Sequence, residues 1–277
     1  MEKTKVSTLF MRFPEGKKKA LTLSYDDGVK QDARLIEIML KNGLKGTFNI
    51  NSGLFQPEGS SVRRMTERQV KELYSDSGME VAVHGLTHPG LAHLSQARCS
   101  YEVIKDRENL EKLFHTVIRG MAYADGSFND EVVACLKTAG IAYARTAYSS
   151  RSFKIPNDWL RLEPTCRHKD TQLKELARKF VEEEVTRESW LFYLWGHSYE
   201  FDDNNNWNII EEFAEYTGNR IDIWYATNIE IYEYIEAYNS LVYSVDGCMV
   251  KNPTIYALYF EKNGKVYCVN PGETLEL

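Results

Sequence analysis

The order of apolar and polar positions predicts strands and helices that alternate along most of the chain. Short apolar runs of strand length occur at 20–25, 46–51, 79–83, 118–122, 141–145, 190–195 and 221–225. Segments with helical spacing of apolar residues lie between them, at 31–42, 66–75, 95–114, 127–137, 171–184, 208–216 and 229–239. Alternation of this kind is typical of a parallel sheet covered by helices. We therefore expect an α/β fold, a distorted (β/α) barrel of about seven parallel strands.

Local signals bound several of these helices. The helix at 31–42 carries a single apolar face made of Leu35, Ile36, Met39 and Leu40. Gly43 follows it at a position where a left-handed residue is easily accommodated. Ser127, with Asp130 three residues later, resembles a capping box that opens the next helix, and Gly140 would end that helix.

After Asn239 the pattern changes to the period of two that indicates half-buried strands. Strands are expected at 241–245, 254–261 and 265–269, with Asn263-Gly264 as a tight hairpin turn between the last two. We interpret this region as a small C-terminal antiparallel β appendage packed on the barrel. The predicted domains are 1–240 for the barrel and 241–277 for the appendage.

Composition and charge narrow the choice of partner and location. With 34 basic and 40 acidic residues, the 277-residue chain has a net charge of -6 and only one tight basic run, at 17–19, which argues against nucleic acid. The first 22 residues contain neither a signal-peptide core nor an 18-residue apolar segment, so we expect a cytoplasmic protein without a membrane anchor. Five scattered cysteines without a CxxC pair indicate reduced thiols. The sequence leaves the oligomeric state open.

Candidate chemistry gathers where predicted strands end. Asp26 and Asp27 follow the strand at 20–25, His84 and His88 follow the strand at 79–83, and His197 follows the strand at 190–195. Each group alone has an ordinary interpretation, since Asp-Asp-Gly is usually a turn and a single histidine is usually structural. The carboxyl ends of parallel barrel strands meet on one face, however, so these side chains would converge there.

These motifs together resemble the polysaccharide deacetylase family, also called the NodB-homology or carbohydrate esterase family four domain. The resemblance covers roughly residues 18 to 235 and includes Ser24 to Gly28, His84 to His88, Leu194 to His197 and the stretch from Gly43 to Phe48. It implies that Asp27, His84 and His88 bind a divalent metal, most often zinc. It also implies that Asp26 is the general base and His197 the general acid.

The third family motif is altered. The family commonly has Arg-Pro-Pro-Tyr-Gly or Ala-Tyr-Pro-Tyr-Gly, whereas this chain has Ala122-Tyr123-Ala124-Asp125-Gly126. The family's oxyanion donor, a backbone N–H, would map onto Asp125, whose extra carboxylate is unexpected beside a developing negative charge. Arg119 and Arg145 are candidate replacements for the missing arginine that steadies the base, and Arg145 is preferred because it ends its strand.

The residue that orients His197 is not determined by the sequence. The family's Asp-Trp element has only a poor match in Asp158-Trp159. Three other residues could take this part, namely Glu163, His168 and Glu200.

Aromatic residues make up 12% of the chain. Most fall on predicted strands and helices, where packing explains them. Trp195, Tyr199 and Trp207 are different because they are expected to surround His197 at the mouth of the site. Together with Tyr123 of the third motif, they are the candidate substrate-binding residues.

The resemblance therefore implies a metal-dependent hydrolase that removes N-acetyl groups from an amino-sugar poly- or oligosaccharide. Metal-activated water, with Asp26 as base and His197 as acid, would carry out the reaction. Two alternatives remain open at this stage. One is a hydrolase of a small non-sugar amide on the same fold, and the other is a catalytically inactive carbohydrate-binding barrel.

Overall fold

A curled, mainly parallel β-sheet forms the centre of the molecule. The computed structural model describes residues 8–277, so the first seven positions of the N-terminal segment discussed above lie outside this description. The strand order is β6-β5-β4-β3-β2-β8-β7, and β9 pairs with β2. The strands are β2 (Lys19–Asp26), β3 (Gly46–Ile50), β4 (Glu80–Val83), β5 (Gly120–Ala122), β6 (Tyr143–Arg145), β7 (Cys166–Arg167), β8 (Trp190–Gly196) and β9 (Ile223–Tyr225).

The central strand β2 is buried along its whole length. From Lys19 to Tyr25 it pairs with β8. It also pairs with β9 at residues 19–21 and with β3 at residues 23–26. The pairings are parallel throughout, so the strand ends gather at one rim, as the alternating pattern predicts. The expected parallel α/β architecture is confirmed, in the form of a half-barrel.

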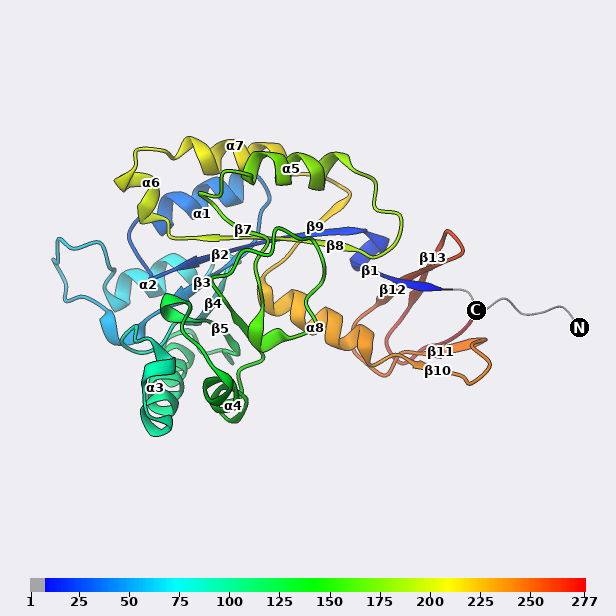
Figure 1. The fold of residues 1–277 in the computed structure, drawn as a ribbon, viewed down its shortest axis with the longest axis horizontal. Coiled ribbons are helices and arrows are strands. Elements are labelled where there is room, and N and C mark those ends of the chain that lie inside the picture. Colours follow the sequence, from blue (N-terminus) through cyan, green and yellow to red (C-terminus); the bar gives the residue numbers. More distant parts are fainter. Residues whose placement is uncertain (1–7) are drawn as a thin grey trace, which may run out of the picture.

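Helices cover the sheet on both sides (Figure 1). Helices α1, α5 and α7 lie along one side, and α3 and α4 lie together on the other. The helices are α1 (Asp32–Lys41), α2 (Glu67–Tyr74), α3 (Gln96–Phe114), α4 (Asp130–Thr138), α5 (Leu173–Glu182), α6 (Tyr199–Asp203), α7 (Asn208–Thr217) and α8 (Asn228–Asn239). None of the helices within residues 8–277 has the length and apolar character needed to cross a membrane.

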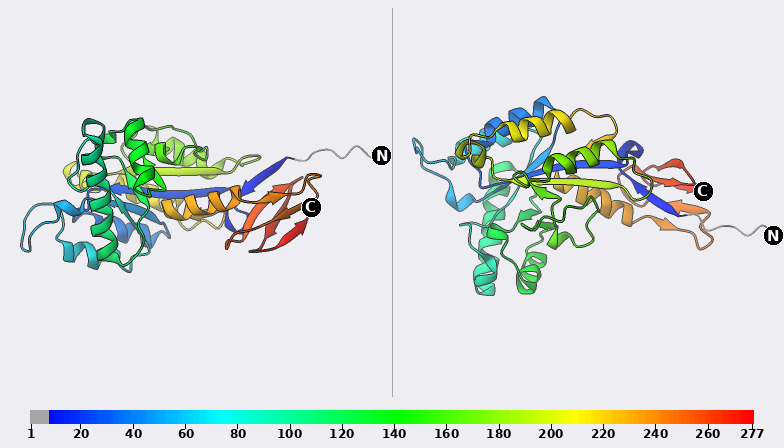
Figure 2. Two further views of the ribbon diagram at one scale, coloured as in Figure 1. Left: turned by 90° about the horizontal axis from the view of Figure 1, so that it is seen from below. Right: turned by 45° about the horizontal axis from the view of Figure 1, so that its top comes forward.

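Two small antiparallel sheets lie beyond one end of the half-barrel (Figure 2). Their strand orders are β1-β12-β13 and β10-β11-β14. The strands are β1 (Leu9–Arg12), β10 (Val242–Tyr243), β11 (Met249–Lys251), β12 (Leu258–Lys262), β13 (Lys265–Val269) and β14 (Thr274–Glu276). Asn263 and Gly264 both have positive φ, as the expected tight turn requires.

A second apolar core joins these sheets to the half-barrel. Phe13 and Phe260 are fully buried there and pack with Tyr234 of α8 and Leu191 of β8. Arg12 is also fully buried, and its guanidinium lies 3.0 Å from Glu261 of β12. The N-terminal strand β1 therefore pairs with the C-terminal region, a long-range contact that the periodicity did not predict. The division at residue 240 stays a prediction.

Local corrections to the sequence reading have simple physical causes. The cap of α4 is Asn129, whose side chain accepts a hydrogen bond from the Val132 N–H, and not Ser127. Ser127 instead accepts a hydrogen bond from the Ala92 N–H. Leu40 is 55% exposed, so only the other three members of its predicted face are buried. Strands β1, β7, β11 and β14, each of two to four residues, are additional to those that the sequence predicts.

Candidate functional site

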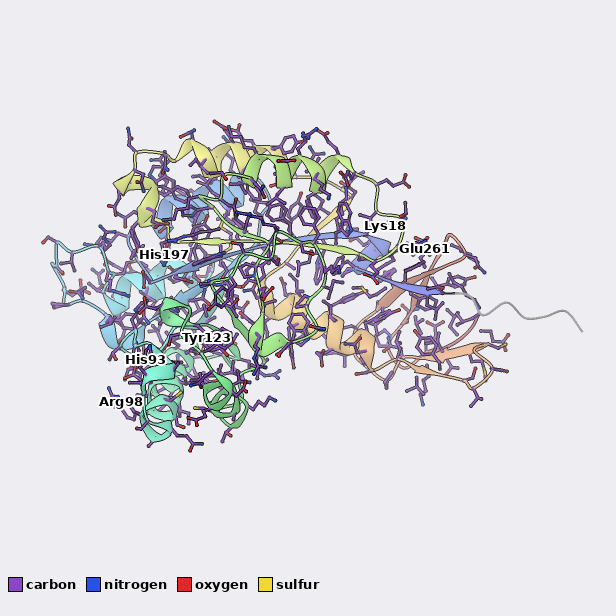
Figure 3. All side chains as sticks on the ribbon, viewed as in Figure 1. Lys18, His93, Arg98, Tyr123, His197 and Glu261 are labelled. Carbon is purple, nitrogen blue, oxygen red and sulfur yellow. The ribbon has the colours of Figure 1, made fainter. Side chains whose placement is uncertain are left out.

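A cavity of about 360 Å³ lies at the carboxyl ends of the strands. It brings together residues from six strand ends and the loops that follow: Asp26, Asp27, His84, His88, Tyr123, Asp125, Gly126, Ala147, Arg167, Trp195, His197 and Tyr199. Figure 3 shows His197 and Tyr123 near this rim and Lys18 and Glu261 toward the opposite end of the molecule. A larger, more apolar cavity of about 620 Å³ lies between α5 and α7, but none of Asp26, Asp27, His84, His88 and His197 lines it.

Asp26 ends β2 and is fully enclosed, with 2% of its surface exposed. Its Oδ2 lies 2.5 Å from the Arg145 guanidinium, and its Oδ1 accepts a hydrogen bond from the Asn49 amide at 2.8 Å. Burial alone would raise the pKa of Asp26, but Arg145, with His84 and His197, lowers it to about 2. The carboxylate is therefore ionised at neutral pH and held in one orientation.

Asp27, His84 and His88 form a possible metal-binding cluster. One ligand atom from each lies within 4.8 Å of the other two. The His84 and His88 rings meet edge to face, with centroids 4.9 Å apart, and His88 Nε2 lies 3.6 Å from Asp27 Oδ1. One carboxylate oxygen with two imidazole nitrogens is a donor set that suits zinc and leaves room for further ligands.

The tautomer of His84 fits this use. Its Nδ1 lies 2.9 Å from the Ala122 carbonyl oxygen, so Nδ1 carries the proton and donates it. The lone pair of Nε2 is then free for a metal ion, in the arrangement that orients histidine ligands generally. Burial lowers the pKa of His84, which further favours the neutral ring that a metal requires.

Three residues of the site have strained backbone conformations. Asp27, His88 and Asp125 have φ values of 87°, 58° and 54°, which place them in the left-handed region that L-residues seldom adopt. Non-glycine residues persist there only when surrounding contacts hold them, and such positions concentrate at functional sites. At Asp27 those contacts include Arg64, whose guanidinium bonds both the Asp27 carbonyl oxygen and Oδ1.

Helix α3 and strand β3 hold the loop that carries the two histidines. The Asp106 carboxylate accepts hydrogen bonds from the backbone N–H of His84 and from Ser52. Glu102 accepts from the backbone and hydroxyl groups of Thr87. The Asn51 amide donates to the His84 carbonyl, so the loop is fixed on both sides.

His197 follows β8, and its Nε2 lies 3.8 Å from Asp26 Oδ2. On the other side of the ring, Nδ1 lies 3.0 Å from Arg167 Nη2 and 3.9 Å from Glu200 Oε2. His168 Nε2 also lies 3.0 Å from that oxygen of Glu200. Of the candidates for the orienting partner, Glu200 therefore lies beside His197. His168 contacts Glu200 on its other side and is linked to His197 through that carboxylate.

The altered third motif places its residues around the cavity in a specific way. Asp125 is exposed and lines the cavity. Tyr123 also contributes to the lining, but its hydroxyl donates to the Leu160 carbonyl and its side chain is buried. The Arg145 guanidinium reaches Asp26, whereas Arg119 lies over the ring of Tyr232.

The aromatic candidates separate into two groups. Trp195 and Tyr199 line the cavity, with ring centroids 5.9 and 5.3 Å from that of His197. The expectation that Trp207 also surrounds His197 is wrong. Trp207 packs against Phe201 and donates its indole N–H to Asp202, because it starts α7 and faces the core under that helix.

Two arginines at the site were not found from the sequence. Arg64 comes from a polar segment before α2, and Arg167 comes from the two-residue strand β7. Neither segment has a periodic pattern or a motif that would mark a functional residue. Only the tertiary pairing brings them to Asp27 and His197.

Comparison with known families agrees with the fold and the motifs. Residues 14–144 match the family model described as polysaccharide deacetylase. No curated protein sequence matches the chain. Strands β2 to β5, Asp26, Asp27, His84 and His88 all lie within the matched region.

Solved structures of similar fold come from several bacteria. A candidate polysaccharide deacetylase from Mycobacterium smegmatis has a TM-score of 0.57 and 16% identity, over 82% of this chain and 93% of that one. A family 4 carbohydrate esterase from Streptomyces lividans, in complex with acetate, gives 0.48 and 14%, over 71% and 88%. The Streptococcus pyogenes deacetylase PplD, also with acetate, gives 0.45 and 23% over 50% of this chain, which spans only 62% of that one. At these identities the similarity concerns the fold.

Proposed function

Because residues 14–144 belong to the polysaccharide deacetylase family, we propose that this protein is a metal-dependent hydrolase that removes N-acetyl groups from an amino-sugar oligo- or polysaccharide. The observation that carries the proposal is the convergence, in one cavity, of the Asp27, His84 and His88 cluster with Asp26 and His197. Zinc is the proposed ion, since one carboxylate and two imidazoles are typical ligands of catalytic zinc.

The residues around the cavity divide the work of amide hydrolysis. When bound, a divalent cation would polarise the amide carbonyl and lower the pKa of the attacking water. Asp26 needs this help because its own low pKa makes it a weak base. Asp26 would accept the proton of the attacking water. The backbone N–H of Asp125 would donate to the oxyanion that develops on the carbonyl oxygen.

His197 completes this assignment as the general acid. Its Nε2 lies 3.8 Å from Asp26 Oδ2, so both side chains can reach the same group when it is bound beside them in the cavity. As the carbon–nitrogen bond breaks, His197 would give a proton to the nitrogen. Protonation is required because an amide anion is a very poor leaving group.

The test combines metal analysis with acetate release from N-acetylated sugars of increasing length. We expect bound metal in the wild-type protein and its loss in His84→Ala. Absence of metal, or full retention in His84→Ala, would overturn the ligand assignment. Bound metal without acetate from any sugar would favour a small-amide hydrolase, and sugar binding without turnover of any amide would favour an inactive binding barrel.

A separate variant tests the acid. We expect His197→Ala to keep its metal and to lose roughly two to four decades of rate, which is the usual contribution of a general acid or base. His197→Gln serves as a matched variant that keeps a polar side chain of similar size without a titratable ring. Unchanged acetate release in both variants would remove His197 from the mechanism.

A further inference from the structure

The contact between Arg167 and His197 determines where the ring proton of His197 lies. Arg167 Nη2 is 3.0 Å from His197 Nδ1, which is hydrogen-bond distance. A guanidinium can only donate hydrogen bonds, so Nδ1 must accept this one with its lone pair. We propose that Arg167 is a positioning residue that fixes His197 as the tautomer with its proton on Nε2.

The proton is thereby placed on the side of the ring that faces the cavity. Nε2 is the nitrogen that lies 3.8 Å from Asp26 Oδ2, whereas Nδ1 faces away from it toward Arg167. A neutral imidazole in water exchanges between two tautomers. Here a single fixed donor favours one of them, the neutral tautomer with its N–H toward the cavity; the imidazolium that gives a proton to the leaving nitrogen carries protons on both ring nitrogens, so it forms only when Nδ1 no longer accepts from Arg167.

Arg167 is itself held firmly enough to act in this way. Its backbone is in β7, where Arg167 pairs with Trp195 of β8, two residues before His197. Its guanidinium donates to Glu200 Oε1 at 2.8 Å and lies 5.0 Å from the centre of the Trp195 ring. The side chain is three-quarters enclosed, so the ion pair with Glu200 is shielded from bulk water.

Glu200 supplies the competing arrangement. Its Oε2 lies 3.9 Å from His197 Nδ1. In the other tautomer Nδ1 carries the proton, and the ring would donate it to this oxygen in place of accepting from Arg167. Three charged groups lie within 4 Å of the ring nitrogens, Asp26 of β2, Arg167 of β7 and Glu200 of α6, and Glu200 in turn pairs with His168 and Lys169. Removal of the Arg167 guanidinium therefore leaves Nδ1 facing only an acceptor, which favours a proton on Nδ1.

The same indole ring lies against the arginines of both proposed catalytic groups. Arg145, which holds Asp26, lies 4.3 Å from the centre of the Trp195 ring, and Arg167 lies 5.0 Å from it. The base and the acid thus each have their own guanidinium, kept in place by one shared side chain. This reading rests on the proposed function only for the role of His197 in the reaction, because the tautomer is a property of the protein itself.

The experiment is a measurement of the histidine ring-nitrogen chemical shifts by NMR on protein labelled with ¹⁵N at histidine. The His197 signals are assigned by their loss in His197→Gln. We expect the wild-type protein at pH 8 to show an unprotonated Nδ1 and a protonated Nε2. Arg167→Met should shift the His197 signals toward the opposite tautomer, while Arg167→Lys, which keeps a donor, should retain much of the wild-type pattern.

A matched control separates this effect from general disturbance. Arg151→Met removes another arginine near the same strand, a half-exposed one that pairs with Asp170, and should leave the His197 signals unchanged.

The outcomes distinguish the two proposals. Identical His197 tautomers in wild-type protein and Arg167→Met, or a wild-type Nδ1 that carries the proton, would overturn the positioning role. The expected tautomer change in a protein that releases no acetate from any substrate would support the positioning role and refute the proposed reaction.

Discussion

Adjacent residues do different work at the site because the chain turns sharply between them. Asp26 still belongs to buried β2 and points to Arg145 and Asn49. Asp27 has a φ of 87°, which turns its carboxylate toward Arg64 and His88. Successive residues at the end of a strand face different directions, and the positive φ increases that divergence. Two neighbouring carboxylates can therefore serve as base and metal ligand.

Arg145→Met tests the buried pair with Asp26. The substitution leaves the Asp26 carboxylate enclosed and without its main counter-charge, so the pKa of Asp26 should rise. We expect the free energy of unfolding in urea to fall by about 3 to 5 kcal/mol at pH 7, the usual consequence of breaking a buried ion pair. Arg161→Met breaks more exposed pairs and should cost less than about 1 kcal/mol. Equal stability of the two variants would refute this account.

At the scale of elements, helix α3 supports the loop that carries His84 and His88 through carboxylates on its buried face. Asp106 and Glu102 are both fully buried and accept hydrogen bonds from the chain around His84 and Thr87. Burial raises the pKa of Asp106 to about 7 in spite of its hydrogen bonds to Ser52 and His84. The helix thus acts at a distance from the cavity, by fixing the backbone of a proposed ligand.

Asp106→Ala should weaken zinc binding roughly tenfold, because the His84 backbone N–H keeps only its bond to the Ile50 carbonyl, Ser52 loses its acceptor, and the loop becomes less ordered. Isothermal titration calorimetry with zinc measures the effect without reference to activity. Glu108→Ala is the control, since Glu108 lies on the exposed side of the same helix and pairs only with lysines. If both variants bind zinc as tightly as wild type, α3 has no such role.

Asp32 links three elements beneath the site. Its carboxylate accepts hydrogen bonds from the hydroxyl groups of Tyr74 in α2 and Ser198 after β8, and from the Val29 N–H before α1. Burial raises its pKa from 3.8 to about 7 despite these bonds. Between pH 3.8 and about 7, the Asp32 carboxyl is therefore protonated in the folded protein and ionised in the unfolded chain.

This raised pKa predicts a pH dependence of stability. Stability due to Asp32 is fully present below its unfolded pKa and is lost as pH rises through about 7. The free energy of unfolding of wild type minus that of Asp32→Asn should therefore decrease by roughly 2 kcal/mol from pH 5 to pH 8. Urea unfolding of both proteins at the two pH values gives this difference, and the contributions of shared histidines cancel. A difference that stays constant or increases with pH would contradict the prediction.

At the scale of the whole molecule, the half-barrel and the C-terminal strands share one structural unit at the end away from the site. Strand β1 pairs with β12, and α8 packs its Ile231 and Tyr234 into the second core. Figures 1 and 2 show these strands beyond the end of the central sheet. The site residues lie at the carboxyl rim of that sheet, and none of them belongs to the second core.

Phe260→Ala tests this separation. Phe260 is fully buried in the second core, so we expect a loss of about 3 to 5 kcal/mol in the free energy of unfolding. Zinc affinity at a temperature where the variant is folded should stay at the wild-type value, because no site residue contacts this core. Val266→Ala, at a 43% exposed position on β13, should change stability little. Loss of zinc binding in folded Phe260→Ala would show that the two ends are coupled.

The sequence by itself determined the architecture and the principal groups of the site. Hydrophobic periodicity predicted β2 to β6, β8, β9 and the long helices, because each is long enough to show its period or is bounded by clear turn residues. The motifs after the strands at 20–25, 79–83 and 190–195 predicted which side chains meet, since parallel strands end at one rim. The metal ligands and the roles of Asp26 and His197 stay predictions until they are measured.

Only the tertiary structure decided which partners act on these groups. Arg64, Arg167 and Asp106 carry no local signal, and they reach Asp27, His197 and His84 through contacts between segments far apart in the chain. Trp207 shows the converse. It is close to His197 in the sequence, but its side chain packs against Phe201 in the core and not against His197. Sequence patterns report the environment of a backbone segment, whereas hydrogen-bond partners depend on distances that exist only after the segments have packed.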